Sequence, residues 1–170
     1  KSPAVFDYDK LNWFNGDYIK AMSSEDFRAQ AMPFYKEVFG DEEKPWEVLD
    51  SILRARLTKF NEIPGLLGFF KELPDYPVDF FVNKKSKTNL ENSPKMLEAA
   101  IEALEQLSAW ELEAIHEGMI NLAQKLEVKN GTLLWPVRIA AAGTLVTPGG
   151  AMEILTLLGK EEALRRVRAG

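Results

Sequence analysis

The sequence predicts an all-α protein. Apolar residues recur at helical spacing along almost the whole chain, whereas the alternating patterns typical of β-strands are scarce. The 170 residues, of which 46% are hydrophobic and 28% charged, suit one globular body or two small lobes. Every apolar run is far shorter than the ~20 residues that span a bilayer, so we expect a soluble protein.

Helix signals begin near the amino terminus. A cap at Asp7 or Asp9 predicts a short helix through residues 10–14. A pattern that resembles a capping box predicts a second helix from Ser23 to Gly40, since a small polar residue favours the start of a helix and glycine its end.

Prolines shape the next predicted elements. Pro33 lies inside the second helix and should kink or split it, because proline lacks the amide hydrogen that a helix interior uses. Pro45 suits the first turn of a third helix, which should end at Ile63-Pro64-Gly65. The periodicity then fails over residues 72–94, where prolines gather with turn formers. We interpret this stretch as the junction of two lobes.

Helix signals return strongly after the junction. Ser108 and Glu111 form a capping box, and the helix that it opens should break at Asn130-Gly131. Gly143 should end a short Ala-rich helix, and a turn at 147–150 separates it from the last two. In order, the predicted helices cover residues 93–107, 108–129, 137–142, 151–158 and 160–169.

Composition excludes several kinds of chemistry. A chain without Cys has no disulfides, thiolate zinc sites or cysteine nucleophiles, and a single His makes multi-histidine metal sites and histidine triads hard to build. Glu98, Glu102 and Glu105 share one helical face, which we interpret as solvated. We expect His116 to be partly exposed and ion-paired among its glutamates. The sequence therefore predicts no catalytic residue and no metal site.

Charge is unevenly distributed along the chain. The net charge of −5 and the pI near 5.1 argue, for the chain as a whole, against a nucleic-acid binder. Residues 95–127, however, carry a net charge of −5, and residues 128–170 a net charge of +3. We therefore expect an acidic face and a basic face on one molecule.

Two basic clusters lie outside the last third of the chain. In the first, Arg54, Arg56 and Lys59, the spacing places Arg56 and Lys59 on one side of a helix, with a solvent-facing ridge as the alternative. The second, residues 84–88, is superficially similar to the KMSKS loop with which class I aminoacyl-tRNA synthetases handle ATP. Because no βαβ unit precedes it and the chain has no HIGH-like tetrapeptide, we interpret it as a solvated basic linker.

A third candidate surrounds the turn at 147–150. Its glycines match neither a Walker loop nor a dinucleotide fingerprint, so turn chemistry is the default interpretation. The backbone amides that open the helix at Ala151 nevertheless lie near Arg138 in the sequence. Together with the Thr147 hydroxyl, they suit RNA phosphates and splayed bases.

Three stretches share their order and spacing with a known family. They are Ser2–Asp7 followed by Lys10–Ile19; Arg56–Ile63; and Pro136–Gly143 followed by Thr147–Gly149, Leu157–Lys160 and Arg165-Arg166. Together they resemble the C-terminal half of the bacterial glutamyl-tRNA synthetases, a class I family. The match at Arg56–Ile63 is the loosest, and Gly150 stands where the family usually has Leu.

The resemblance implies a fold and a partner. The fold would be two helical lobes of the α-helix cage type, with residues 1–22 ending the stem-contacting domain and residues 23–73 and 74–170 forming the anticodon-binding lobes. The chain would be a fragment of a cytoplasmic, monomeric ligase that lacks the catalytic domain, where ATP and Mg²⁺ act, and it would itself hold no cofactor. Its partner would be tRNA(Glu) through the anticodon loop, with no role for DNA or a membrane.

The resemblance also implies RNA-binding residues. Arg56 would distinguish the glutamate anticodon from the glutamine one, although the alignment also allows Arg54. The competing hypothesis is a helical interaction module with no RNA role, which the net negative charge favours. The RNA-binding residues implied or suggested are Arg54, Arg56, Lys59, Arg138, Thr147, Pro148 and Gly149.

Overall fold

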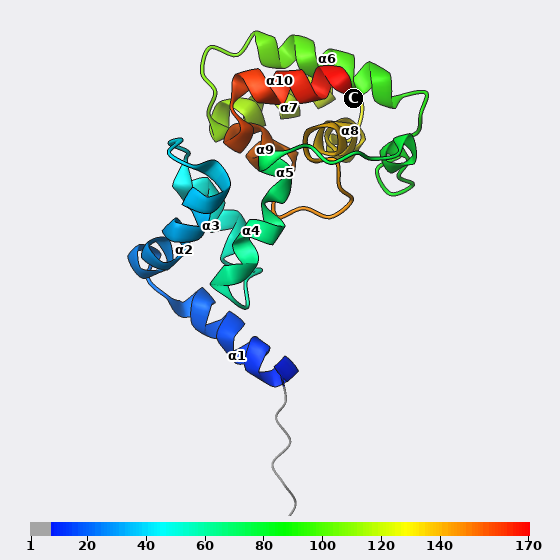
Figure 1. Cartoon of the computed structure of the whole chain (residues 1–170). Coiled ribbons are helices and arrows are strands. Elements are labelled where there is room, and N and C mark those ends of the chain that lie inside the picture. Colours follow the sequence, from blue (N-terminus) through cyan, green and yellow to red (C-terminus); the bar gives the residue numbers. More distant parts are fainter. Residues whose placement is uncertain (1–7) are drawn as a thin grey trace, which may run out of the picture. The chain divides into compact units, whose positions relative to one another are not determined.

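The computed structural model describes residues 8–170, with the backbone alone at residues 8–10 and 12–14. Its regular structure is helical, which confirms the all-α prediction (Figure 1). The β-pairing within the described chain is one antiparallel bridge, between Asn83 and Thr88. The stretch Ser2–Asp7, with the possible cap at Asp7, lies outside the described residues.

The chain divides into two compact units, of which the first ends at Gly68 and the second runs from Phe69 to Gly170. The assignment of residues 1–22, 23–73 and 74–170 to three domains stays a prediction. The first unit holds α1 (Tyr8–Ala21), α2 (Ser24–Phe39), α3 (Trp46–Leu53), η1 (Phe60–Glu62) and α4 (Ile63–Leu66). From the boundary onward follow α5 (Gly68–Lys71), η2 (Val78–Phe81), α6 (Ser93–Glu105), α7 (Leu112–Lys125), α8 (Asn130–Ala142), α9 (Ala151–Leu158) and α10 (Lys160–Ala169).

Helix α2 begins and ends where the sequence predicts. The Asp26 amide donates a 3.1 Å hydrogen bond to the Ser23 hydroxyl, which satisfies one of the free amides of the first turn. At the other end, Gly40 has a φ of 62° and its amide donates to the Lys36 carbonyl. Of the two effects predicted for Pro33, a kink or a split, the split does not occur, since the helix continues through it.

Helix α3 is much shorter than predicted. It ends at Leu53, and Arg54–Arg56 form a turn, because Leu57 is drawn into the core, where it is 1% exposed. The motif Ile63-Pro64-Gly65, predicted to end this helix, instead begins α4. The reason is that proline fits the first turn of a helix, where its missing amide hydrogen costs no hydrogen bond.

The second unit is built around α8, which packs against α6, α7, α9 and α10. Its last four residues are small or β-branched and fully buried, so neighbouring helices approach closely. Gly143 ends the helix as predicted, in the left-handed conformation with φ 65°. The predicted bounds of α9 and α10 are confirmed.

Two predicted boundaries around α7 are wrong. The helix begins at Leu112, not at a Ser108 cap, because the Trp110 indole turns aside and donates a 2.9 Å hydrogen bond to the Leu155 carbonyl. Asn130 opens α8, which is therefore twice as long as the predicted Ala-rich helix. The chain reverses just before it, at Glu127, which has a φ of 57°.

The segment over 72–94 is irregular up to the start of α6 at Ser93, as predicted, apart from η2 and the Asn83–Thr88 bridge. It lies within the second unit. The lysines of residues 84–88 are exposed, as predicted, but the segment is an ordered turn within the second unit and not a linker. The turn is fixed by hydrogen bonds from the Ser86 amide to the Asn83 side chain (2.8 Å) and from the buried Thr88 hydroxyl to the Phe81 carbonyl (2.7 Å).

Candidate nucleic-acid interface

Arg138 lies on the face of α8 that the core leaves uncovered. Its guanidinium donates three hydrogen bonds into the following loop: from Nη1 to Thr144 O (3.3 Å) and Thr147 Oγ1 (3.1 Å), and from Nη2 to Leu145 O (2.9 Å). Burial lowers the pKa of Arg138, but a guanidinium starts so far above neutrality that it stays charged. Arg138 therefore fixes the shape of loop 143–150.

Trp135 supports the Arg138 guanidinium from one turn earlier in α8. The guanidinium carbon lies 4.7 Å from the centre of the Trp135 rings, a cation–π arrangement. The indole nitrogen in turn donates a 2.9 Å hydrogen bond to the Phe80 carbonyl. The sequence analysis missed Trp135, although its i, i+3 spacing to Arg138 on a helix is a signal that could have found it.

The predicted turn at Thr147–Gly149 is present and is held by hydrogen bonds of the Thr147 side chain. The Thr147 hydroxyl accepts from Arg138 and donates a 3.0 Å hydrogen bond to the Gly149 carbonyl. Thr147 and Pro148 are buried, and Gly149 has a φ of 73°. These residues give the loop its form, while its outer surface belongs to Leu145, 46% exposed, and Val146, 73% exposed.

The helix that follows the turn is capped by one of its own carboxylates. The Gly150 amide, which opens α9, donates to the Glu153 carboxylate at 3.3 Å. This carboxylate satisfies one amide at the start of α9. That the amides opening the helix at Ala151 meet RNA phosphates stays a prediction.

Arg54 and Arg56 follow α3 in the first unit, but they differ in environment. Arg54 is half-buried, with its guanidinium 5.8 Å from the Phe27 ring and a 3.4 Å contact from Nη1 to the Ser24 hydroxyl. Arg56 is exposed, and so is Lys59. Because α3 ends at Leu53, the prediction that Arg56 and Lys59 share one side of a helix is wrong.

The turn that carries Arg56 is held by residues on its carboxyl side. The Thr58 hydroxyl donates a 2.6 Å hydrogen bond to Glu62, and the Thr58 amide donates to the same carboxylate at 3.2 Å. Burial alone would raise the pKa of Glu62, but these hydrogen bonds outweigh it, and the pKa is lowered. The charged carboxylate therefore stabilises the conformation of residues 57–62.

The structure brings together only part of the predicted site. Arg138, Thr147 and Gly149 form one hydrogen-bonded unit, with Pro148 buried between the last two. Arg54, Arg56 and Lys59 belong to the other unit of the chain. That Arg56 faces the same surface as Arg138 and Thr147 stays a prediction.

Comparison with known proteins decides the family. A family model described as an anticodon binding domain matches residues 14–170. The chain belongs to this family. It is 47% identical over its whole length to a glutamate–tRNA ligase of Clostridium tetani and 46% identical to one of Clostridium novyi. It spans about a third of the length of these relatives, 35% and 36%.

Solved structures share the fold of this anticodon-binding domain. A glutamate tRNA ligase from Elizabethkingia meningosepticum superimposes with a TM-score of 0.75 at 24% identity, over 99% of this chain and 33% of that one. A glutamate–tRNA synthetase from Elizabethkingia anophelis gives a TM-score of 0.74 at 23% identity, over 99% and 32%.

The other polar candidates of the anticodon-binding domain lie at its surface. Glu98, Glu102 and Glu105 are exposed, as predicted. His116 is exposed too, as predicted, but among the described side chains it makes no ion pair, so the predicted pairing with its glutamates is wrong. In the same range no group of three or more acidic or histidine side chains could hold a metal ion, and none of the helices could cross a membrane.

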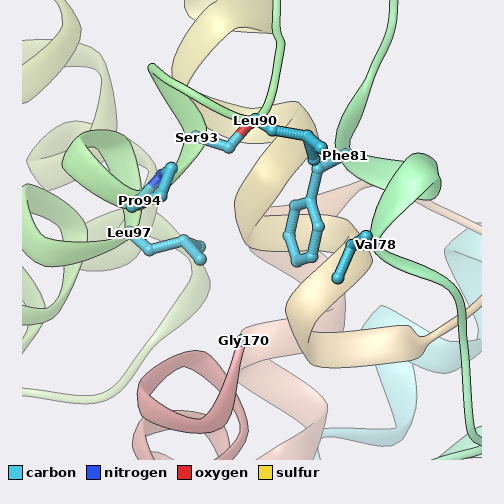
Figure 2. Close-up of a pocket in the computed structure, with 7 residues that line it drawn as sticks. All are labelled: Val78, Phe81, Leu90, Ser93, Pro94, Leu97 and Gly170. Carbon is cyan, nitrogen blue, oxygen red and sulfur yellow. The ribbon is translucent and has the colours of Figure 1, made fainter.

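An apolar pocket of about 270 Å³ lies in the second unit, between η2 and the amino end of α6. Its one polar side chain, Ser93, is buried, and within the described residues its hydroxyl has no hydrogen-bond partner. Such a lining suits an apolar group and not a phosphate. Figure 2 shows the residues around it: Val78, Phe81, Leu90, Ser93, Pro94, Leu97 and Gly170.

Proposed function

We propose that this chain is the anticodon-binding part of a glutamate–tRNA ligase and that it binds tRNA(Glu) through the anticodon loop. The observation that carries the proposal is sequence identity of 45–47% with such ligases across the whole chain. The ordered loop 143–150 supports it, because a preformed loop recognises splayed bases without first being ordered.

The proposal assigns the chemistry of aminoacylation to the rest of the ligase. The whole protein would attach glutamate to tRNA(Glu) in the cytoplasm, using ATP and Mg²⁺, as a monomer. This chain would contribute recognition only and would be inactive alone. Mixing it with glutamate, ATP, Mg²⁺ and tRNA(Glu) should give no charged tRNA, and measurable charging would contradict this assignment.

Arg56 is proposed to read the last anticodon base. A guanidinium presents five donors in a planar fork, which pairs with a base edge in a way that a lysine ammonium does not. Arg56 is exposed, whereas Arg54 is half-buried. This difference in burial favours Arg56 over Arg54 for contact with RNA.

Loop 143–150 is proposed to contact the other anticodon bases. Arg138 and Thr147 hold the loop, and Leu145 and Val146 present apolar surface at its tip. Loss of Arg138 would therefore weaken binding by releasing the loop as well as by removing a charge. Pro148 and Gly149 set the turn that places this tip.

Binding to two tRNAs tests the proposal. The chain should bind tRNA(Glu) more tightly than the same tRNA with a changed anticodon, and Arg138→Met should reduce that preference. The matched control is Arg165→Met, since Arg165 is also an arginine of the second unit but is exposed and hydrogen-bonds to the neighbouring Glu162. Equal binding of both tRNAs would contradict anticodon recognition, and no binding at low salt would favour a protein-interaction module.

A further inference from the structure

Four lysines gather around the amino end of α8. Three of them, Lys84, Lys85 and Lys87, belong to the turn over 84–88, and Lys129 immediately precedes the helix. All four are exposed, and among the side chains that the structure describes no ion pair involves them. Neither residues 80–90 nor residues 128–138 contain an acidic residue. We call these four residues the lysine cluster.

The lysine cluster is rigidly attached to α8. The Thr132 hydroxyl donates a 2.7 Å hydrogen bond to the Ser86 carbonyl. Gly131 faces the same residue, since a Cβ added to it would lie 3.5 Å from the Ser86 hydroxyl oxygen. Within the turn, the Lys87 amide donates to the Lys84 carbonyl at 3.2 Å. The positions of the lysine backbones are therefore fixed relative to the helix.

A partly exposed stripe along α8 runs from the lysine cluster to loop 143–150. The residues of α8 that are not buried are at positions 130, 131, 134, 135 and 138. Gly131, Trp135 and Arg138 fall on one helical face, because they are spaced i, i+4, i+7. A helix of 13 residues is about 20 Å long, so the cluster and the loop lie at opposite ends of that stripe.

We propose that the lysine cluster binds backbone phosphates of the RNA strand whose bases reach loop 143–150. This inference rests on the proposed function. The cluster supplies charge without the base-reading geometry of arginine, and contacts of that kind position a nucleic acid without reading its sequence. Concentrated charge of this kind is notable on a chain with a net charge of −5, where non-specific attraction to RNA is weak.

Salt dependence is the measurement that identifies phosphate contacts. Each neutralised phosphate of single-stranded nucleic acid contributes a slope of about −0.7 to log K against log salt concentration. The test variant combines Lys84→Ala, Lys85→Ala and Lys87→Asn. Asparagine is used at 87 because that residue has a φ of 57°, which Asn tolerates better than Ala.

The test compares tRNA(Glu) binding between 50 and 200 mM salt for the wild-type chain and this variant. If all three lysines contact phosphates, the slope of log K against log salt concentration should be about 2 less steep in the variant. The preference for the native anticodon should stay unchanged. Replacing the same three lysines with arginine should keep the wild-type slope. The matched control is Lys36→Ala, Lys71→Ala and Lys160→Ala, which removes equal charge elsewhere and should leave the slope unchanged.

The outcomes separate this inference from the proposed function. If binding depends on the anticodon but the variant keeps the wild-type salt slope, the inference about the lysine cluster is wrong and the proposed function stands. The same holds if the matched control changes the slope as much as the variant does. Binding that ignores the anticodon but weakens in the variant overturns anticodon recognition and supports the cluster. Absence of tRNA binding by the wild-type chain overturns both.

Discussion

Three arginines of this chain differ in burial. Arg166 is 1% exposed and joins backbone from distant segments, Arg138 is half-buried and shapes a loop, and Arg56 is exposed and is the one proposed to contact RNA. A fork of five donors satisfies several carbonyl groups at once, so a buried arginine joins backbone from distant segments.

Arg166→Met should destabilise the second unit strongly. Arg166 donates to the carbonyls of Phe69, Phe70 and Ala141, and to Glu162. Methionine fills similar space but leaves those carbonyls unpaired, and breaking such a network costs roughly 3–5 kcal/mol. Urea unfolding measures the effect. Arg165→Met is the control, since Arg165 also pairs with Glu162 but is exposed, and an equal loss there would contradict the proposed role.

Glu162 should make stability depend on acid pH. Hydrogen bonds from Arg165, and then from Arg166, outweigh burial and lower the pKa of Glu162 from 4.5 to about 2. Since the pKa is depressed in the folded state, the stabilisation is complete above about pH 4.5 and is lost as the pH falls toward 2. The difference in unfolding free energy between wild type and Glu162→Gln should therefore shrink between pH 5 and pH 3. A constant difference would mean that the carboxylate charge contributes nothing.

Removing two buried hydroxyls, those of Ser93 and Thr88, should change the stability of the chain in opposite directions. Ser93 has no hydrogen-bond partner in the described residues, so Ser93→Ala should stabilise the chain by about 1 kcal/mol. Thr88 donates to the Phe81 carbonyl, so Thr88→Val should destabilise it by about 1–2 kcal/mol. Thermal unfolding of both variants compares them directly. Destabilisation by Ser93→Ala would indicate that a water molecule or a ligand in the pocket binds the hydroxyl.

At the scale of elements, two separate constraints require glycine at the end of α8: a left-handed backbone and a close contact. Gly143 is left-handed, and a Cβ added to it would lie 2.9 Å from the Pro74 carbonyl oxygen and 3.0 Å from the Tyr76 ring. The irregular segment 72–94 therefore packs directly on this helix end. Only a residue without a side chain allows both the turn and the contact.

Gly143→Ala and Gly143→Asn should separate these two effects. Left-handed backbone costs alanine about 1–2 kcal/mol, and asparagine less. Both residues carry the Cβ that meets Pro74, so both should destabilise the chain by more than that amount, with Asn recovering little. Full recovery in Gly143→Asn, measured by urea unfolding, would show that conformation alone determines the requirement for glycine.

At the scale of the whole molecule, local signals predicted the elements well where tertiary contacts agree with them. Ser23, Gly40 and Gly143 mark helix ends in the sequence and in the structure, because caps depend on residues three or four positions away. The boundaries near Leu53 and Ser108 were wrong because distant contacts decide them. Leu57 is drawn into the core, and the Trp110 indole bonds to a residue 45 positions away.

The candidate site also combines features that local residues determine with features that distant contacts determine. The turn at Thr147–Gly149 was predictable from its own residues, whereas the support of Arg138 by Trp135 and the seating of the 84–88 turn on α8 were not. The latter contact joins Thr132 to Ser86, which are 46 positions apart. No local pattern encodes such a pairing, so a basic segment that looks like a linker proves to be an ordered surface.

The proposed role of Arg56 makes one prediction about recognition by the proposed full-length ligase. If Arg56 reads the last anticodon base, its loss should alter the choice between tRNAs more than the charging of the right one. Guanidinium pairing with a base edge is worth about 1–3 kcal/mol, so Arg56→Gln should reduce discrimination between tRNA(Glu) and tRNA(Gln) about tenfold. The charging efficiency of the full-length enzyme on both tRNAs measures this ratio.

Arg54→Gln is the matched control, since Arg54 packs on Phe27 and should affect the stability of the chain and not the choice between tRNAs. If Arg54→Gln alone shifts the ratio, Arg54 is the arginine that reads the base. If neither variant shifts it, no arginine of this turn reads the base.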